Sequence, residues 1–177
     1  MALAFFDKKV QAKGNVRFSY LPSPSYSSQE QFSMRPFSKI VARSLNGHVV
    51  KGYTQDFDPD ASCFCLWENP TEASEQQPVN LRMKDLKAIF FVRTFDGNPH
   101  YIERRDFIEG DRSYGDRVEV TFGDGEVVRG FRIDLYPRGS GFFLLPPDPK
   151  GNNIMIFALF KAVKDLHYLE ATLVSAT

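Results

Sequence analysis

The sequence predicts a mainly all-β fold. Two tandem five-stranded barrels pack together, and an N-terminal arm precedes them. First, residues 39–66 return at residues 117–144 without a gap when 78 is added to each number, and an internal repeat of this kind decides the architecture. Second, short alternating apolar runs are separated by Gly, Pro, Asn and Asp, as in strands joined by turns. Third, 177 residues with 42% apolar content suffice for two small units that stabilise each other.

The first two strands of each repeat are expected to form a hairpin. In the second copy Val118, Val120 and Phe122 alternate with polar residues, which is typical of a strand with one buried face. Asn46-Gly47 and Asp124-Gly125 supply the positive φ angles that a tight turn needs.

The second strands, expected over 49–57 and 127–135, are each interrupted by a glycine. Gly52 and Gly130 indicate a sharp bend, which a small sheet needs in order to close on itself. The remaining strands are expected at 63–67, 79–86 and 88–92 in the first copy, and at 142–145, 154–160 and 162–169 in the second.

Two details of the second copy fix how the repeats are expected to relate. Residues 142–145 are apolar on both faces, so we expect the two barrels to pack through their Phe-rich third strands. After this strand the alignment offset becomes 74, because Lys161-Ala162 then matches Lys87-Ala88. The loop before the fourth strand is therefore expected to be four residues shorter in the second copy.

Four segments result: an N-terminal arm (1–38), the first repeat (39–92), a connector (93–115) and the second repeat (116–177). Residues 100–108 of the connector are expected to form a short helix. The arm contains a plausible strand that ends at Tyr20, followed by a Pro/Ser-rich stretch at 21–28. Two interpretations stay open: a floppy tail, or an arm that lays its apolar residues on the second barrel or a neighbouring subunit. Those residues are Phe5, Phe6, Val16, Phe18 and Phe32.

Composition narrows the functional classes. Lys and Arg number 22, and so do Asp and Glu, so the basic excess that is usual in nucleic-acid binders is absent overall. Cys63 and Cys65 are the only cysteines and are too far apart on one strand for a strain-free disulfide, which fits a reducing compartment. No run is long enough for a membrane span, and the start does not read as a signal peptide. We therefore expect a cytoplasmic protein without membrane insertion.

Both hairpins carry a resemblance to a known family. Residues 122–130, Phe-Gly-Asp-Gly-Glu-Val-Val-Arg-Gly, and residues 45–52 resemble the first half of the Sm signature. The resemblance implies an Sm-like, or SH3-like, barrel. Of the family's RNA-binding positions, Asp58 matches, Ser62 replaces an Asn, and Lys87-Ala88 and Lys161-Ala162 replace an Arg-Gly pair. It therefore implies the fold without most of the RNA pocket.

A second resemblance covers about residues 39–169. It rests on residues 86–93, Gly125-Glu126, residues 141–144, Pro147-Asp148 and Asn152-Asn153. Together these resemble an uncharacterised bacterial family with tandem Sm-like units, whose members sometimes also contain a PilZ domain. This implies a bacterial setting and no particular chemistry.

Two clusters could bind a ligand. Glu103-Arg104-Arg105-Asp106 and residues 111–115 resemble the motifs by which PilZ domains hold cyclic di-GMP, but their spacing differs, and a solvated linker is favoured. Cys63 and Cys65 with His48 could hold a soft metal, although Gly141 and Phe143 at the equivalent positions favour packing.

The expected function is that of a non-enzymatic adaptor for protein–protein interaction or regulatory assembly, with a protein partner or self-association. No cofactor, metal or catalytic residue is expected. The alternative is a nucleic-acid or cyclic-dinucleotide binding module. The residues for ligand contact would be Lys87, Lys161, Arg104, Arg105 and Asp58.

Overall fold

The computed structural model describes residues 36–72, 77–108, 111, 115–133 and 139–169. These residues form ten strands and three single-turn 3₁₀ helices, so the protein is mainly β. The first half contains β1 (Ser38–Ser44), β2 (Val49–Thr54), β3 (Cys63–Leu66), η1 (Pro70–Glu72), β4 (Val79–Arg82), η2 (Met83–Asp85) and β5 (Leu86–Val92). The second half contains β6 (Asp116–Phe122), β7 (Val127–Arg132), β8 (Gly141–Leu145), β9 (Asn153–Leu159), η3 (Phe160–Ala162) and β10 (Val163–Tyr168). None of the helices in this part of the chain has the length and apolar character to cross a membrane.

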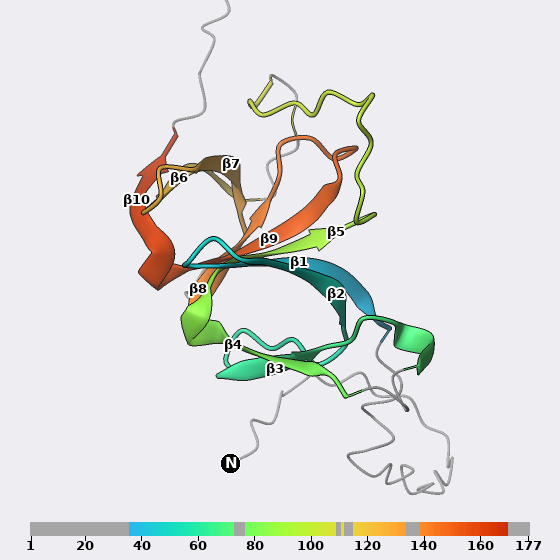
Figure 1. The fold of residues 1–177 in the computed structure, drawn as a ribbon. Coiled ribbons are helices and arrows are strands. Elements are labelled where there is room, and N and C mark those ends of the chain that lie inside the picture. The colour runs from blue at the N-terminus through green and yellow to red at the C-terminus, as the bar shows by residue number, and fades with distance from the viewer. Residues whose placement is uncertain (1–35, 73–76, 109–110, 112–114, 134–138, 170–177) are drawn as a thin grey trace, which may run out of the picture.

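Eight strands form one large sheet, in the order β10-β6-β7-β8-β9-β5-β1-β2, and β3 and β4 form a small second sheet. A single bridge between Tyr53 and Trp67 connects the small sheet to β2. Figure 1 shows β5 and β9 side by side across the middle of the molecule, with β6, β7 and β10 on one side and β3 and β4 on the other. The sheets are not closed among the described strands, so the expected pair of complete barrels is not what the hydrogen bonding shows.

The two halves use the same strand order and the same register. Each places its first strand between its second and its fifth, and its third beside its fourth. Both bend glycines sit at the same place in the ladder, because Ile40 pairs with Gly52 and Val118 pairs with Gly130. A Cβ on either glycine would lie 2.7 Å from a backbone carbonyl oxygen of the third-strand segment, at Trp67 or Leu145.

The register corrects the sequence alignment of the last two strands. Ser44 pairs with Leu86, and the equivalent Phe122 pairs with Val163, which gives an offset of 77 rather than 74. Both ladders also slip at the next residue, so Lys87 corresponds to Lys164 and not to Lys161. The match of Lys87-Ala88 with Lys161-Ala162 was wrong, because the first pair lies in β5 and the second lies in η3. The loop is shorter by one residue, not four.

The halves are joined by antiparallel pairing of β5 with β9, from Ala88 opposite Ala158 to Phe91 opposite Met155. The expectation that the halves pack through their third strands holds only in part: Phe143 of β8 packs against the core of the first half, which contains Phe64 of β3, but the strands that join the halves are β5 and β9. The physical reason is that β5 and β9 are apolar on both faces, so each strand must be covered on both sides.

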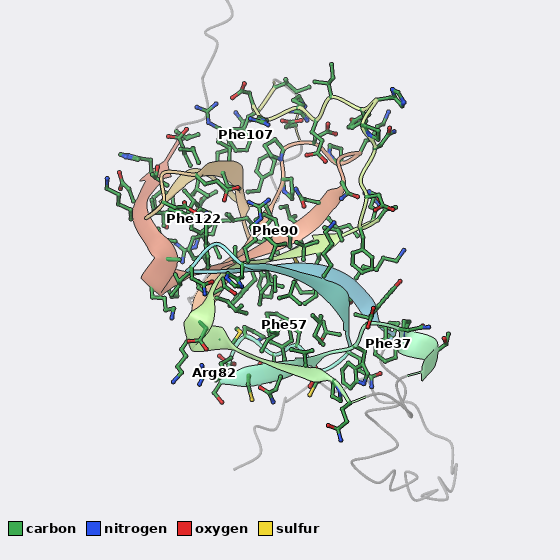
Figure 2. The ribbon with its side chains drawn as sticks, viewed as in Figure 1. Phe37, Phe57, Arg82, Phe90, Phe107 and Phe122 are labelled. Atoms are coloured by element: carbon green, nitrogen blue, oxygen red, sulfur yellow. The ribbon has the colours of Figure 1, made fainter. Side chains whose placement is uncertain are left out.

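Alternation along the two joined strands divides their side chains between two cores. From β5, Phe90 enters the core of the second half and Ile89 enters the core of the first. From β9, Ile156 enters the core of the second half and Phe157 that of the first. The labelled rings of Phe90 and Phe57 lie on opposite sides of the central strands in Figure 2. Each half therefore supplies part of its neighbour's interior.

The connector differs from the short helix expected over 100–108, because residues 101–105 have no regular structure. The Arg104 amide donates to the Asp148 carboxylate at 3.0 Å, so this stretch is bonded to the loop before β9 instead of to itself. The N-terminal arm, up to residue 35, lies outside the described residues, as do residues 112–114 of the predicted dinucleotide motif.

Candidate functional site: the cleft between the halves

A cleft runs where the two halves meet, and it consists of two hollows of about 490 and 590 Å³. The hollows share five lining residues, which are Arg43, Phe90, Glu103, Glu126 and Asn153. We call these hollows together the inter-half cleft. It is lined by β1, β2 and β5 of the first half, the β6–β7 hairpin of the second half, the connector, the loop before β9 and the first part of β9.

The cleft has an apolar floor. Phe90 and Ile156, from the two joined strands, are 5% and 3% exposed and belong to the core of the second half. The Arg43 guanidinium lies over the Phe90 ring, 4.6 Å from its centroid. Half-exposed Val49 and Val127 stand in the lining of the two hollows. The floor follows from the pairing of β5 with β9, since that pairing turns Phe90 toward the second half.

The β6–β7 hairpin brings two carboxylates to the cleft. Gly125 has φ of +87° in the tight turn, and the Asp124 side chain accepts the Glu126 amide at 3.1 Å. This places both carboxylates on Lys87, whose Nζ lies 2.5 Å from Glu126 Oε2 and also contacts Asp124. Glu126 Oε1 further accepts from Arg43 at 2.7 Å.

Lys87 lies on β5 where the register with β1 shifts, and its side chain is only 7% exposed. Its ammonium also lies 4.5 Å from the centroid of the Phe122 ring. Two acids and an aromatic face together stabilise a cation that would otherwise be costly to bury. Lys87 therefore connects β5 to the hairpin of the other half. We call Lys87, Arg43, Asp124 and Glu126 together the ion cluster.

The ion cluster lowers the pKa of both acids. The hydrogen bond from Lys87 holds the pKa of Asp124 below its usual range, and the Glu126 amide adds to this effect. Burial alone would raise the pKa of Glu126, but the bonds and charges of Lys87 and Arg43 outweigh it and lower the pKa. Both side chains are therefore charged at neutral pH.

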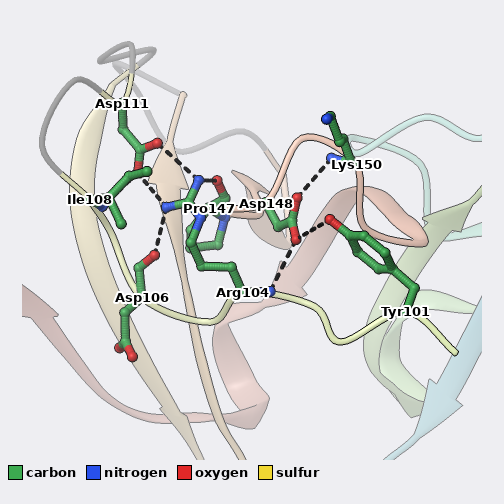
Figure 3. Close-up of polar contacts among 8 residues, drawn as sticks. All are labelled: Tyr101, Arg104, Asp106, Ile108, Asp111, Pro147, Asp148 and Lys150. Carbon is green, nitrogen blue, oxygen red and sulfur yellow. Dashed lines mark hydrogen bonds and ion pairs between the residues drawn. The ribbon is translucent and has the colours of Figure 1, made fainter.

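On the connector side, Arg104 is bonded on all sides (Figure 3). Its guanidinium donates two bonds to Asp111, at 2.7 and 2.9 Å, and further bonds to the carbonyls of Asp106 and Pro147. The hydrogen bonds from Arg104 hold the pKa of Asp111 below its usual range. A guanidinium with these partners has a structural role, because few of its donors are left for a ligand.

Asp148 also binds the connector, and it lies next to Pro147 in the loop between β8 and β9. It is 7% exposed and accepts the Tyr101 hydroxyl at 2.8 Å and the amides of Arg104 and Lys150 at 3.0 and 2.9 Å. Burial raises its pKa, yet these three bonds prevail and the net pKa is lowered. The bond to Asp148 in turn raises the pKa of Tyr101. The connector is thus fixed against the loop that enters β9.

The structure brings three of the five predicted contact residues to the cleft. Lys87, Arg104 and Arg105 line it, although the first two are already bonded to acids and Arg105 is exposed. Lys161 lies in η3, away from the lining, and Asp58 accepts the Asp60 amide at 2.9 Å in a turn of the first half.

Sequence reasoning missed Arg43, Phe90 and Glu126. A signal existed in the repeat itself, because Asp124 and Glu126 replace Asn46 and His48 of the first copy. Acids that occur in only one of two equivalent turns indicate a contact made by only one copy.

No group of three or more His, Cys, Asp or Glu residues that could hold a metal occurs within the described ranges. Cys63 and Cys65 are free and half-buried, and burial together with Asp56 raises the pKa of the Cys65 thiol. Asp56 accepts the Cys65 amide at 3.0 Å, so this stretch reads as strand packing.

The sequence over residues 37–170 matches a family described as a family of unknown function, DUF6982. The chain belongs to the DUF6982 family. The match covers every strand of both halves, so the DUF6982 region includes the joint and the inter-half cleft. No curated protein and no solved structure matches the chain.

Proposed function

We propose that this DUF6982 protein is a non-enzymatic adaptor that binds another protein through the inter-half cleft. The observation that carries the proposal is the pairing of charges above an apolar floor. Lys87 and Arg43 are neutralised by Asp124 and Glu126, while Val127 remains half-exposed beside them. Apolar contact area bordered by charges of both signs suits a protein surface better than a polyanion.

The fold supports the same proposal. Each half has the strand order 5-1-2-3-4 with a sharp glycine bend, and we assign both to duplicated Sm-like, or SH3-like, barrels. Such barrels serve as rigid scaffolds for binding loops, and here the loops of two units meet at one cleft. The role would be regulatory assembly in a bacterial cytoplasm, in keeping with the resemblance to chains that contain PilZ domains.

The alternative function is binding of a nucleic acid or a cyclic dinucleotide. It is favoured by the exposed Arg105 and by Arg129, which line the same hollow. Against it, Arg129 is paired with Glu119 and Asp106, and Arg104 with Asp111. A phosphate ligand would have to break these pairs, so the protein partner is the stronger proposal.

The test compares two charge reversals of the full chain. Arg105→Glu lies in the cleft and Lys164→Glu lies on exposed β10, so both change the net charge equally. Affinity capture from bacterial lysate, followed by titration of each recovered protein, should show binding lost in Arg105→Glu and kept in Lys164→Glu. Fluorescence titration with oligouridine and cyclic di-GMP provides the opposing result. Binding that weakens steeply with salt and disappears in Arg105→Glu would replace the adaptor by the alternative.

A further inference from the structure

The outer edge of β4 lacks a partner among the described strands, although its equivalent in the second half is paired on both sides. β4 pairs only with β3, whereas β9 pairs with both β8 and β5. By register, Val79 pairs with Leu66 as Ile156 pairs with Leu144. Yet Val79 is 55% exposed and Ile156 is 3% exposed. The difference is the strand that covers β9 and is missing at β4.

The face that this missing strand would cover belongs to the core of the first half. Val79 and Leu81 lie opposite Leu66 and Phe64, both of which are buried in that core. Side chains paired across two strands point to the same side. The exposed Val79 is therefore an interior position that lacks its cover, and not part of the outer surface of the small sheet.

The backbone of β4 also presents donors at this edge that have no partner among the described residues. The Met83 amide donates to the Ser62 carbonyl, and bonded pairs alternate along an antiparallel ladder. Leu81 consequently bonds to β3, while the amides of Asn80 and Arg82 point away from it. The Cys65 amide, opposite Asn80, points away from β4 and bonds to Asp56. The edge is thus arranged to accept one more strand.

A second copy of this chain does not supply a suitable strand. The equivalent of β5 would be β10, where Asp165 and His167 replace Ala88 and Phe90. A carboxylate placed against the core without a partner is costly. Moreover Asn80 and Arg82 replace Phe157 and Leu159, so nothing on β4 is prepared to enter another core.

The arm of the same chain does supply one. Val16, Phe18 and Tyr20 recur at every second residue with Arg17 and Ser19 between them, which gives one apolar and one polar face. Ala88, Phe90 and Val92 have the same spacing on β5, with Phe in the middle. A lone strand with solvent beyond it also explains why Asn80 and Arg82 are polar.

The chain enters the described structure beside the end of β3 that pairs with the start of β4. The Phe37 ring packs edge-on against Trp67, with centroids 5.6 Å apart, and Trp67 follows the Leu66 that pairs with Val79. The 15 residues from 21 to 35 can span roughly 50 Å when extended, which is ample for a return along a four-residue strand. Residues 1–35 hold five of the 22 basic and two of the 22 acidic residues, so the arm carries +3 and the remainder −3. Opposite charges favour docking in the same chain.

We propose that residues 16–20 form a strand that pairs with the outer edge of β4 and covers Val79 and Leu81 with Val16, Phe18 and Tyr20. The arm then does for the first half what β5 does for the second. The occupant is the protein's own chain, and the proposal is independent of any partner in the inter-half cleft.

Hydrogen exchange by NMR on the full-length protein tests this proposal. In the wild type the outward amides of Asn80 and Arg82 should be protected, and Phe18 should show nuclear Overhauser contacts to Val79. Phe18→Asp should speed exchange of these two amides roughly tenfold or more, because a buried aromatic contact is lost. Protection of Ile89 on β5 should not change, which shows that the fold persists.

The matched control is Phe32→Asp, which places the same charge in the arm outside the proposed strand and should leave Asn80 and Arg82 protected. Two results overturn the proposal. One is exchange of Asn80 and Arg82 at the rate of an unstructured peptide in the wild type. The other is protection that disappears on dilution, with contacts to Val79 that arise between differently labelled molecules, since the strand would then come from a second copy.

Discussion

The same structural unit occurs twice in this chain, yet its edge strands carry different side chains at two kinds of place. These are the joint, where β5 pairs with β9, and the free ends at β4 and β10. At the joint, Phe90 from β5 and Phe157 from β9 each enter the core of the other half. At the free ends the equivalent positions hold His167 on β10 and Asn80 on β4. Polar side chains at these positions cannot enter the core of another unit, so neither free edge joins a further unit as β5 joins β9. The comparison teaches that the backbone ladder permits association and that side chains decide where it happens.

The two lysines at the register shifts of β5 and β10 also differ between the joint and the free end. Lys87 is buried against Asp124 and Glu126 of the other half, whereas its equivalent Lys164 is exposed on β10. If a further copy of the first half paired with β10, its β1–β2 turn would face Lys164. That turn carries Asn46 and His48 in place of Asp124 and Glu126, so it would offer Lys164 no acid. One joint is therefore encoded in this chain, and it is encoded by charge as well as by apolar area.

The largest expected effect comes from truncation at the joint. Phe157→Ala removes a fully buried ring from the core of the first half and should lower the free energy of unfolding by about 3–5 kcal/mol. Because β9 serves both cores, urea unfolding followed by Trp67 fluorescence and by far-ultraviolet circular dichroism should give coincident transitions.

The control for that truncation is Asn80→Ala at the equivalent free position, which should change stability by less than about 0.5 kcal/mol. Two separate transitions, one for each half, would contradict the shared interior described for the joint.

The next effect sharpens the comparison by testing a feature that the halves share. Gly52→Ala and Gly130→Ala each push a Cβ to 2.7 Å from a backbone carbonyl oxygen, so each should cost about 1–3 kcal/mol. Differential scanning calorimetry of the two variants should show similar losses. A loss at one site only would mean that the bends are not equivalent.

A smaller effect is expected from the two lysines, which distinguish joint from free end. Lys87→Ala removes the bonds to Asp124 and Glu126 and the contact with Phe122, and should cost about 1–3 kcal/mol. Lys164→Ala should stay within about 0.5 kcal/mol. Equal losses in chemical denaturation of the two variants would show that the ion cluster does not stabilise the joint.

The smallest effect is the acid dependence of the same ion cluster. The pKa values of Asp124 and Glu126 are depressed in the folded protein, below ordinary values of about 3.8 and 4.5. Their stabilisation is therefore fully present above the ordinary values and is lost as the pH falls through the depressed ones. Unfolding measured from neutral pH to about pH 3 should show a smaller acid loss in Lys87→Ala than in the wild type. An unchanged pH profile would count against the depressed pKa values.

Local features of the fold could be predicted from the sequence because local chemistry fixes them. The tight turns at Asn46-Gly47 and Asp124-Gly125 and the bends at Gly52 and Gly130 lie where expected. The joint could not be predicted, since an apolar strand such as residues 86–92 reads the same whichever strand covers it. The structure of the connector could not be predicted either. A charged stretch with apolar residues is compatible with a short helix, but the Arg104 amide donates to Asp148, which is distant in the sequence.

The cleft was only partly predictable for the same reason. Lys87, Arg104 and Arg105 stood out by residue type, but two of them are bonded to acids that are 7 to 39 residues away in the sequence. Arg43 and Glu126 are separated by 83 residues, and only the pairing of β5 with β9 brings them together. Spacing arguments apply within a strand or a turn, and this site is assembled across the joint.

Shared interiors have a consequence for how the chain is made. Synthesis completes β5 at Val92, but β9, which must lie beside it, begins only at Asn153. Throughout that interval the nascent first half carries a finished strand with an apolar, unpaired border. Such borders bind chaperones and other nascent chains readily. Ribosome-associated folding factors would therefore meet this protein at Leu86–Val92 before its own second half does.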